Sequence, residues 1–196
     1  MDAAPRRRWR RRTAVVAVIA ALSAVVITAT AYALFTAGPR IEDFDGEGSA
    51  TLATYVAGPS TFSFSLSSLC LESPGRVTVT DVVATSATGG LTVTDFALVA
   101  WVPTPGGGSE STITKRRKTL AENLRGRPAT TELSATCDDG DEIPELVVQI
   151  DKTIAGVART RGFDVRYRSG GRTHEVHIRY GLVVCEEDGS RCPERA

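Results

Sequence analysis

The stretch FDVRYRSGGRTHEVHIRY, residues 163–180, carries the clearest structural signal in the chain. Apolar residues alternate with polar ones from Phe163 to Tyr167 and again from Val176 to Tyr180, on either side of Ser169-Gly170-Gly171. Such alternation is typical of a strand with one buried face, and paired glycines supply the positive φ angles of a tight turn. We therefore predict a β-hairpin whose second strand runs from His174 to Cys185.

Other strand patterns precede this hairpin. Thr61–Leu66 alternates strictly and predicts a half-buried strand, and a bulge at Ser67-Ser68 would return the leucines after it to the core face. Ala129–Thr136 also has a strand pattern, and Glu145–Ile150 predicts a strand that is buried on most sides. Short strands with turn signals about every ten residues favour an all-β fold, an antiparallel β-sandwich of immunoglobulin-like type, with a barrel as the alternative.

Two segments resemble each other. Val77–Ala84 and Leu91–Ala100 share the sequence Thr-Val-Thr-Asp, and Ala87–Gly90 between them ends in two glycines. We predict that these segments form a second hairpin. The motif occurs only twice and at a spacing too short for a solenoid repeat, so we interpret the segments as two similar strands.

The N-terminal region has the composition of a membrane anchor. Thr13–Phe35 contains 23 residues and no charge, which as a helix would extend about 34 Å, a little more than the hydrocarbon core of a bilayer. The arginines in front of it are Arg6, Arg7, Arg8, Arg10, Arg11 and Arg12. Because positive residues stay on the cytoplasmic side, we predict a single-pass signal anchor in the cytoplasmic membrane, with the N-terminus inside and everything after about residue 40 outside.

A cleaved signal peptide is the competing interpretation. Ala29-Thr30-Ala31 and Ala31-Tyr32-Ala33 are small-x-small sites of the kind that signal peptidase recognises. The apolar run is longer than the hydrophobic region of most signal peptides, which favours the anchor. Either interpretation exports the same domain.

These boundaries divide the chain into a cytoplasmic tail (1–12), an anchor (13–35), a juxtamembrane linker (36–48) and one exported domain (49–196). Of the chain's 23 basic and 23 acidic residues, six Arg and one Asp lie in the tail, which leaves 17 basic and 22 acidic residues, a net charge of −5, after the anchor. A mildly acidic domain argues against a nucleic-acid binder, whose phosphate contacts need a positive surface.

Four cysteines lie in the exported part, and an even number in an oxidising compartment indicates two disulfides. Cys185 and Cys192 flank a short polar loop, so a local bridge is geometrically easy, and Cys70 would then pair with Cys137. Four cysteines allow three pairings, of which we favour this one. A zinc site is the alternative, but the sequence has no Cys-x-x-Cys pair.

Few residues suggest chemistry at a site. His174 and His177 would lie on opposite faces of a strand and should not bind one metal together. The acidic run Asp138–Glu142 offers oxygen ligands but lacks the spacing of a calcium loop. No motif for nucleophilic catalysis, phosphate binding or zinc hydrolysis is present, so we expect neither an enzyme nor a cofactor.

The most concentrated charge in the exported domain lies in residues 111–127, for which a short helix and an exposed hairpin fit equally well. The basic residues there are Lys115, Arg116, Arg117, Lys118, Arg125 and Arg127. Such a run is usually solvated surface, and its functional interpretation is a site for an acidic partner or an anionic polymer of the envelope.

An arginine-rich tail, one anchor and a Thr/Val-rich β domain ending in the hairpin Tyr167–Arg172 resemble uncharacterised single-pass membrane proteins of actinobacteria. The resemblance implies an exported β-rich domain and no active site. We expect a structural or partner-binding role in the envelope. A module that binds a small ligand or a metal for a membrane complex is the alternative.

Overall fold

The computed structural model describes residues 38–43, 50–100, 119–140, 143–186 and 192. Pro39–Ala196 form one compact unit. Its described strands are β1 (Ile41–Asp43), β2 (Ala50–Tyr55), β3 (Ser60–Leu71), β4 (Val77–Thr85), β5 (Leu91–Val99), β6 (Ala129–Thr130), β7 (Glu132–Leu133), β8 (Glu145–Lys152), β9 (Ala158–Thr160), β10 (Gly162–Ser169), β11 (Arg172–Ile178) and β12 (Tyr180–Cys185). The helix α2 (Leu120–Asn123) is short, so the prediction of an all-β fold is confirmed.

No helix among these described residues is long and apolar enough to cross a membrane. The predicted anchor, residues 13–35, and the arginines before it lie outside the described residues.

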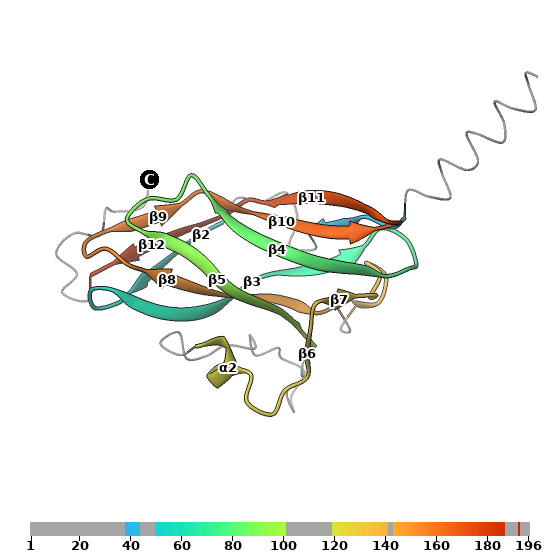
Figure 1. Ribbon diagram of the computed structural model, residues 1–196, viewed down its shortest axis with the longest axis horizontal. Helices are drawn as coiled ribbons and strands as arrows, with labels where there is room; N and C mark the ends of the chain where they lie inside the picture. The colour runs from blue at the N-terminus through green and yellow to red at the C-terminus, as the bar shows by residue number, and fades with distance from the viewer. Residues whose placement is uncertain (1–37, 44–49, 101–118, 141–142, 187–191, 193–196) are drawn as a thin grey trace, which may run out of the picture. The chain divides into compact units, whose positions relative to one another are not determined.

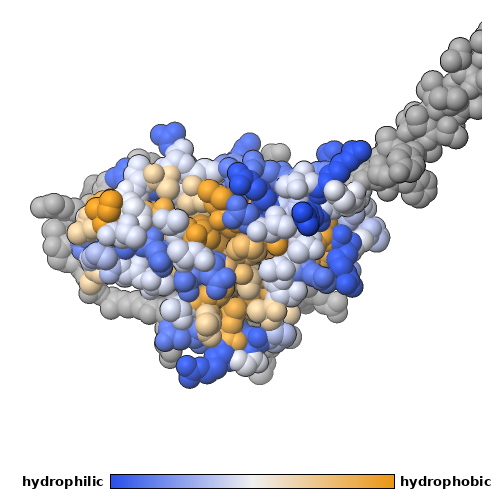
Figure 2. Space-filling view, in the orientation of Figure 1, coloured by the Kyte–Doolittle hydropathy of each residue, from blue (hydrophilic) through white to orange (hydrophobic). Residues whose placement is uncertain are grey.

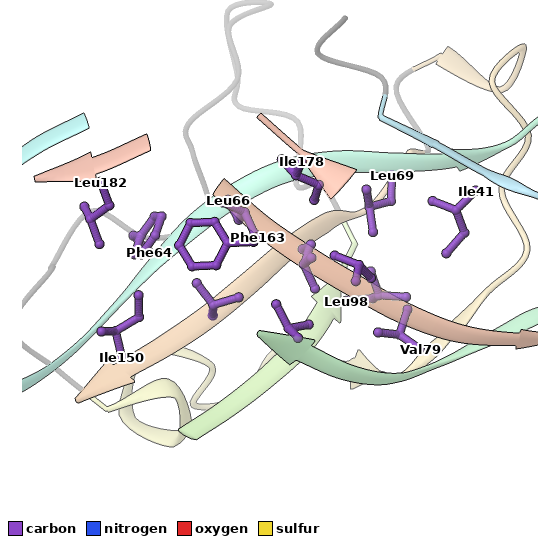
Figure 3. Close-up of a cluster of buried hydrophobic side chains, with 14 of the residues drawn as sticks. Ile41, Phe64, Leu66, Leu69, Val79, Leu98, Ile150, Phe163, Ile178 and Leu182 are labelled. Carbon is purple, nitrogen blue, oxygen red and sulfur yellow. The ribbon is translucent and has the colours of Figure 1, made fainter. Parts of the chain in front are cut away.

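The strands form three hydrogen-bonded sheets, with the orders β1-β3-β8-β5-β6, β11-β10-β4-β7 and β2-β12-β9. The first two sheets face each other across one apolar core (Figure 1). Figure 3 shows Phe64 of β3 beside Phe163 of β10 in the centre of this core, and their rings meet edge to face at 6.1 Å. The pairs are antiparallel except that of β12 with β2, which is parallel.

The hairpin at residues 162–178 is confirmed, but its second strand is shorter than predicted. Phe163 to Ser169 of β10 pair with Ile178 to Arg172 of β11, and the turn glycines Gly170 and Gly171 have φ angles of 54° and 77°. The predicted strand from His174 to Cys185 divides at Arg179. β11 stays with β10, whereas β12 joins β2 and β9 in another sheet.

β3 contains the predicted bulge, one position earlier than expected. Its register against β8 shifts between Ser65 and Ser67, so Leu66 is the extra residue. Leu69 and Leu71 after the bulge are fully buried, as predicted. Both faces of β3 are covered, because Ser63 on the side away from the core is also fully buried.

The predicted hairpin between residues 77–84 and 91–100 is wrong. β4 pairs with β10 and β7, and β5 pairs with β8 and β6, so the two similar strands lie in different sheets. Gly89 and Gly90 have the positive φ angles expected of a turn, but the connection crosses between layers. There Thr88 bonds to Arg159 in both directions.

The repeated motif has a structural counterpart. The register of β4 shifts between Val79 and Asp81, and that of β5 shifts between Val93 and Asp95. The second threonine of Thr-Val-Thr-Asp is therefore a bulge residue in both strands. In β4 the shift places Val82 in the core and leaves the next residue exposed.

The predicted linker and the segment 111–127 are described in part, at residues 38–43 and 119–127. Within the predicted linker, Ile41–Asp43 form β1 at the edge of the first sheet, and Ile41 is buried. In the segment 111–127, α2 begins with a capping box in which the hydroxyl of Thr119 accepts from Glu122 and the Glu122 carboxylate accepts from the Thr119 backbone. Leu120 packs over the outer face of the first sheet with Ala97, Val99 and Val147.

Both predicted disulfides are present. Cys70 is bonded to Cys137, and Cys185 to Cys192. The first joins the end of β3 to the loop after β7, and the second joins the end of β12 to the C-terminal segment.

Candidate binding surface at the Lys152 end of the domain

The domain has two distinct ends, set by the direction of β3. Leu71 at the end of β3 pairs with Ile41, directly after the entry of the chain at Pro39, whereas Ser60 at the start of β3 pairs with Lys152. We call these the Pro39 end and the Lys152 end. The 12 residues of β3 span about 36 Å at the usual rise of a strand, so the two ends are well separated.

The Lys152 end is built around a buried ammonium group. The side chain of Lys152 is 0% exposed, and its Nζ donates to the carbonyl of Gly58 at 3.1 Å and to Oε1 of Glu186 at 3.2 Å. A buried charge needs such partners, because an unpaired ammonium group in the interior is very costly. Lys152 therefore joins the loop between β2 and β3 to the residue that follows β12.

Glu186 completes this network. Its carboxylate accepts from the backbone N–H groups of Gly156 and Gly58 in addition to Lys152. The hydrogen bonds from Gly156 and Gly58, followed by that from Lys152, lower the pKa of Glu186. The network, Lys152 with Glu186, Gly58 and Gly156, is called the Lys152 network below.

A second set of contacts fixes the remaining loops at this end. The backbone N–H and the hydroxyl of Thr153 both donate to the carbonyl of Gly90. A Cβ atom on Gly89 would lie 2.6 Å from Cα of Ala158, so only glycine allows this close approach. The connection between the layers is thereby packed against the β8–β9 loop.

Two large apolar side chains are exposed at the Lys152 end of the domain. Ile154 in the β8–β9 loop is 58% exposed, and Tyr55 at the end of β2 is 48% exposed. Figure 2 shows strongly hydrophobic atoms exposed at this end of the domain. Single exposed apolar residues are common on protein surfaces. Here, however, each lies within three residues of a member of the Lys152 network, which ties both segments to the domain.

The outer face of β4, β10 and β11 carries paired charges. Arg166 donates from Nε to Glu175 at 3.0 Å and from Nη1 to Asp81 at 3.3 Å. The hydrogen bond and charge of Glu175 raise the pKa of Arg166. These exposed ion pairs lie across neighbouring strands and support the sheet register, each contributing little because water screens them.

The two histidines lie on opposite faces of β11, as predicted. His177 bonds through Nδ1 to Oδ1 of Asp164 at 2.7 Å on the outer face, and its ring lies over the backbone of Gly162. His174 stacks on Tyr167 with ring centroids 5.4 Å apart. On opposite faces the two rings cannot bind one metal together, and each contacts a residue of β10, Asp164 or Tyr167.

The remaining predicted site residues are only partly described. Asp139 accepts from the backbone N–H of Thr136, which commits one of its carboxylate oxygens to a local turn. Residues 141–142 of the acidic run and Lys115, Arg116, Arg117 and Lys118 of the basic run lie outside the described residues. Arg125 and Arg127 follow α2 and are exposed.

One further group of side chains is not predicted by the sequence. Glu42, Cys70 and Cys137 each have a ligand-type atom within 4.8 Å of the others, at the Pro39 end. Sequence spacing gives no hint of it, since the three residues come from three separate segments. The sequence does not predict the Lys152 network for the same reason, although a buried lysine at the end of an apolar strand is unusual.

No protein-family model matches the sequence, and no curated protein matches it. Among solved structures, that of the Vibrio cholerae VesB protease aligns with 76% of this chain, at 10% sequence identity and a TM-score of 0.33. The alignment covers 32% of the protease chain, so this chain spans about a third of its length. At that TM-score the similarity has no bearing on fold or activity.

Proposed function

We propose that the chain is a single-pass protein of the cytoplasmic membrane that displays its β domain on the outer side and acts there by binding a protein partner of the cell envelope. The sequence supports the anchor and its orientation through the apolar run 13–35 and the arginines at 6–12. Two disulfides support an oxidising compartment for the domain.

We further propose that the domain is a variant of the immunoglobulin-like sandwich. Its support is the packing of two largely antiparallel sheets on one core, with consecutive strands β4 and β5 in different layers. It differs from antibody domains, in which a disulfide joins strands of the two sheets. Here Cys137 lies in a loop and not in a strand that faces Cys70 across the core.

The observation that carries the binding proposal is the exposure of Ile154 and Tyr55 on the rigid Lys152 end. The chain enters the domain at Pro39, four residues after the apolar run ends at Phe35. Four residues reach at most about 14 Å, so only a short tether joins the apolar run to the domain. Apolar anchors on a preorganised frame favour binding, because little conformational entropy is lost.

Site-specific photo-crosslinking in native membranes tests this proposal. A photoreactive side chain at position 154 should give a discrete adduct, whereas the same group at position 83 should not. Val83 is a matched control because it is also apolar and 40% exposed, but lies on the outer face of β4. Equal adducts at both positions, or an adduct at 83 alone, would contradict the assignment of the Lys152 end.

The basic run gives the competing location for a partner. Changing Lys115, Arg116, Arg117 and Lys118 to serine should leave the adduct at position 154 unchanged. If the quadruple variant instead abolishes the adduct, and the wild-type adduct also weakens between low and physiological salt, the partner binds through charge at the basic run. That result would replace the Lys152 end as the binding surface.

A further inference from the structure

We propose that reduction of the Cys70–Cys137 disulfide creates a zinc site whose protein ligands are the two thiolates and the carboxylate of Glu42. The site goes beyond the proposed partner binding, because it lies at the Pro39 end of the domain. It would hold a divalent metal of borderline softness, since thiolates select zinc over magnesium or calcium.

The fold holds the three residues together independently of the disulfide. Glu42 of β1 is the direct antiparallel partner of Cys70 in β3. The backbone N–H of Cys137 donates to the carbonyl of Leu71 at 3.2 Å, next to Cys70. Backbone hydrogen bonds thus position all three ligand-bearing residues, so opening the S–S bond does not by itself release them.

The spacing fits tetrahedral zinc. With Zn–S near 2.3 Å and Zn–O near 2.1 Å, a sulfur and an oxygen ligand lie about 3.6 Å apart, and two sulfur ligands about 3.8 Å apart. Oε2 of Glu42 is already 3.5 Å from Sγ of Cys137. The two sulfur atoms must separate once the S–S bond is broken, and the carboxylate of Glu42 lies within 4.8 Å of both of them. A water molecule would take the fourth position.

The conversion needs a reductant, which is a dithiol. Its thiolate attacks one sulfur of the disulfide, the S–S bond breaks, and resolution by the second thiol leaves the reductant as a disulfide. Two electrons pass to Cys70 and Cys137, which become thiols. Zinc then displaces their two protons, because only thiolates are ligands. The segments joined by a covalent bond in the oxidised protein are joined by the metal in the reduced protein.

Cobalt(II) titration of the full-length chain in detergent tests the site, in a variant with Cys185→Ser and Cys192→Ser so that no other thiols form. The oxidised protein should show no thiolate-to-cobalt absorption. After a phosphine reductant is added, one equivalent of cobalt should produce this band, and zinc should displace it. Glu42→Gln should weaken the affinity about tenfold or more, since even residues that only support a ligand cost 10- to 100-fold. Glu72→Gln, an exposed carboxylate near the same end, should leave it unchanged.

Three results would overturn the proposal. The first is the absence of the band in the reduced protein, and the second is an affinity that Glu42→Gln leaves unchanged, since the cysteines would then bind without Glu42. The third is loss of the β-sheet circular dichroism on reduction that zinc does not restore, because the folded site would then not exist.

Discussion

Glu186 is the residue whose ionisation most directly links the chemistry of one side chain to the stability of the domain. Its pKa is lowered in the folded protein from the usual value of 4.5 by hydrogen bonds from Gly156, Gly58 and Lys152. A carboxylate with a lowered pKa stabilises the folded state above its unfolded pKa, and this contribution is lost as the pH falls through the folded pKa. The Lys152 network should therefore weaken in acid.

We predict that Glu186→Gln lowers the melting temperature at pH 7, and that the difference from the wild type shrinks as the pH falls below about 4.5. Thermal unfolding followed by circular dichroism from pH 7 to pH 3 measures this. Glu72→Gln, which changes an exposed carboxylate outside the network, should show no such trend. A difference between Glu186→Gln and wild type that stays constant with pH would mean that ionised Glu186 does not stabilise the fold.

Phe163 gives a matching prediction for the core. Its side chain is 0% exposed and contacts Phe64 from the facing sheet. Phe163→Ala should cost about 3 to 5 kcal/mol of unfolding free energy, because it removes apolar burial and leaves a cavity between the layers. Denaturant titration measures the loss, and a cost below about 1 kcal/mol would show that the two sheets do not share this core.

At the scale of elements, the connection between β4 and β5 depends on glycine for two separate reasons. Gly89 has a positive φ of 67°, and there is no room for a Cβ atom on it. Gly126, in the loop after α2, serves as a comparison, because its φ is also positive, at 81°, but the space around it is open. Both positions disfavour an L side chain by about 1 to 2 kcal/mol. Only Gly89→Ala adds a steric overlap with Ala158, which should cost about 1 to 3 kcal/mol more.

We therefore predict that Gly89→Ala is clearly less stable than Gly126→Ala in denaturant titrations. Equal losses would mean that the backbone at Ala158, where β9 begins, moves aside without cost. In that case the Lys152 end would not be the rigid frame that the binding proposal requires.

The same connection shows where sequence patterns succeed and where they stop. Alternation identified β3 and the β10–β11 hairpin, and a nearly continuous apolar run identified β8, because burial of one or both faces of a strand has a local signature. The turn at Gly89 and Gly90 was also recognised, but the pairing of the strands beside it was not. Partner choice depends on contacts between distant segments, here Thr88 with Arg159 and Gly90 with Thr153. The Lys152 network and the group of Glu42, Cys70 and Cys137 could not be predicted for the same physical reason.

At the scale of the whole molecule, the two disulfides should contribute unequally. The Cys70–Cys137 bridge spans 67 residues and the Cys185–Cys192 bridge spans seven. Chain entropy predicts losses of about 4 and about 2 kcal/mol when each pair is replaced by serine. Denaturant titrations of the two double variants check this order. The reverse order would show that the short bridge stabilises the Lys152 end by more than the long bridge stabilises the domain through restraint of the unfolded chain.

We propose above that the segment 13–35 holds the β domain outside the cytoplasm. The most direct measurement is the activity of a reporter that works only outside the cytoplasm, fused after Ala196 of the full-length chain, together with the intact mass of the chain in carbonate-washed membranes. We predict an active reporter, the uncleaved mass in the membrane pellet, and weakened or inverted orientation when the arginines at 6–12 become glutamate. A mature N-terminus near Thr30–Leu34 in a soluble extract would identify a cleaved signal peptide, and a reporter that is inactive outside while its cytoplasmic counterpart is active would contradict the account.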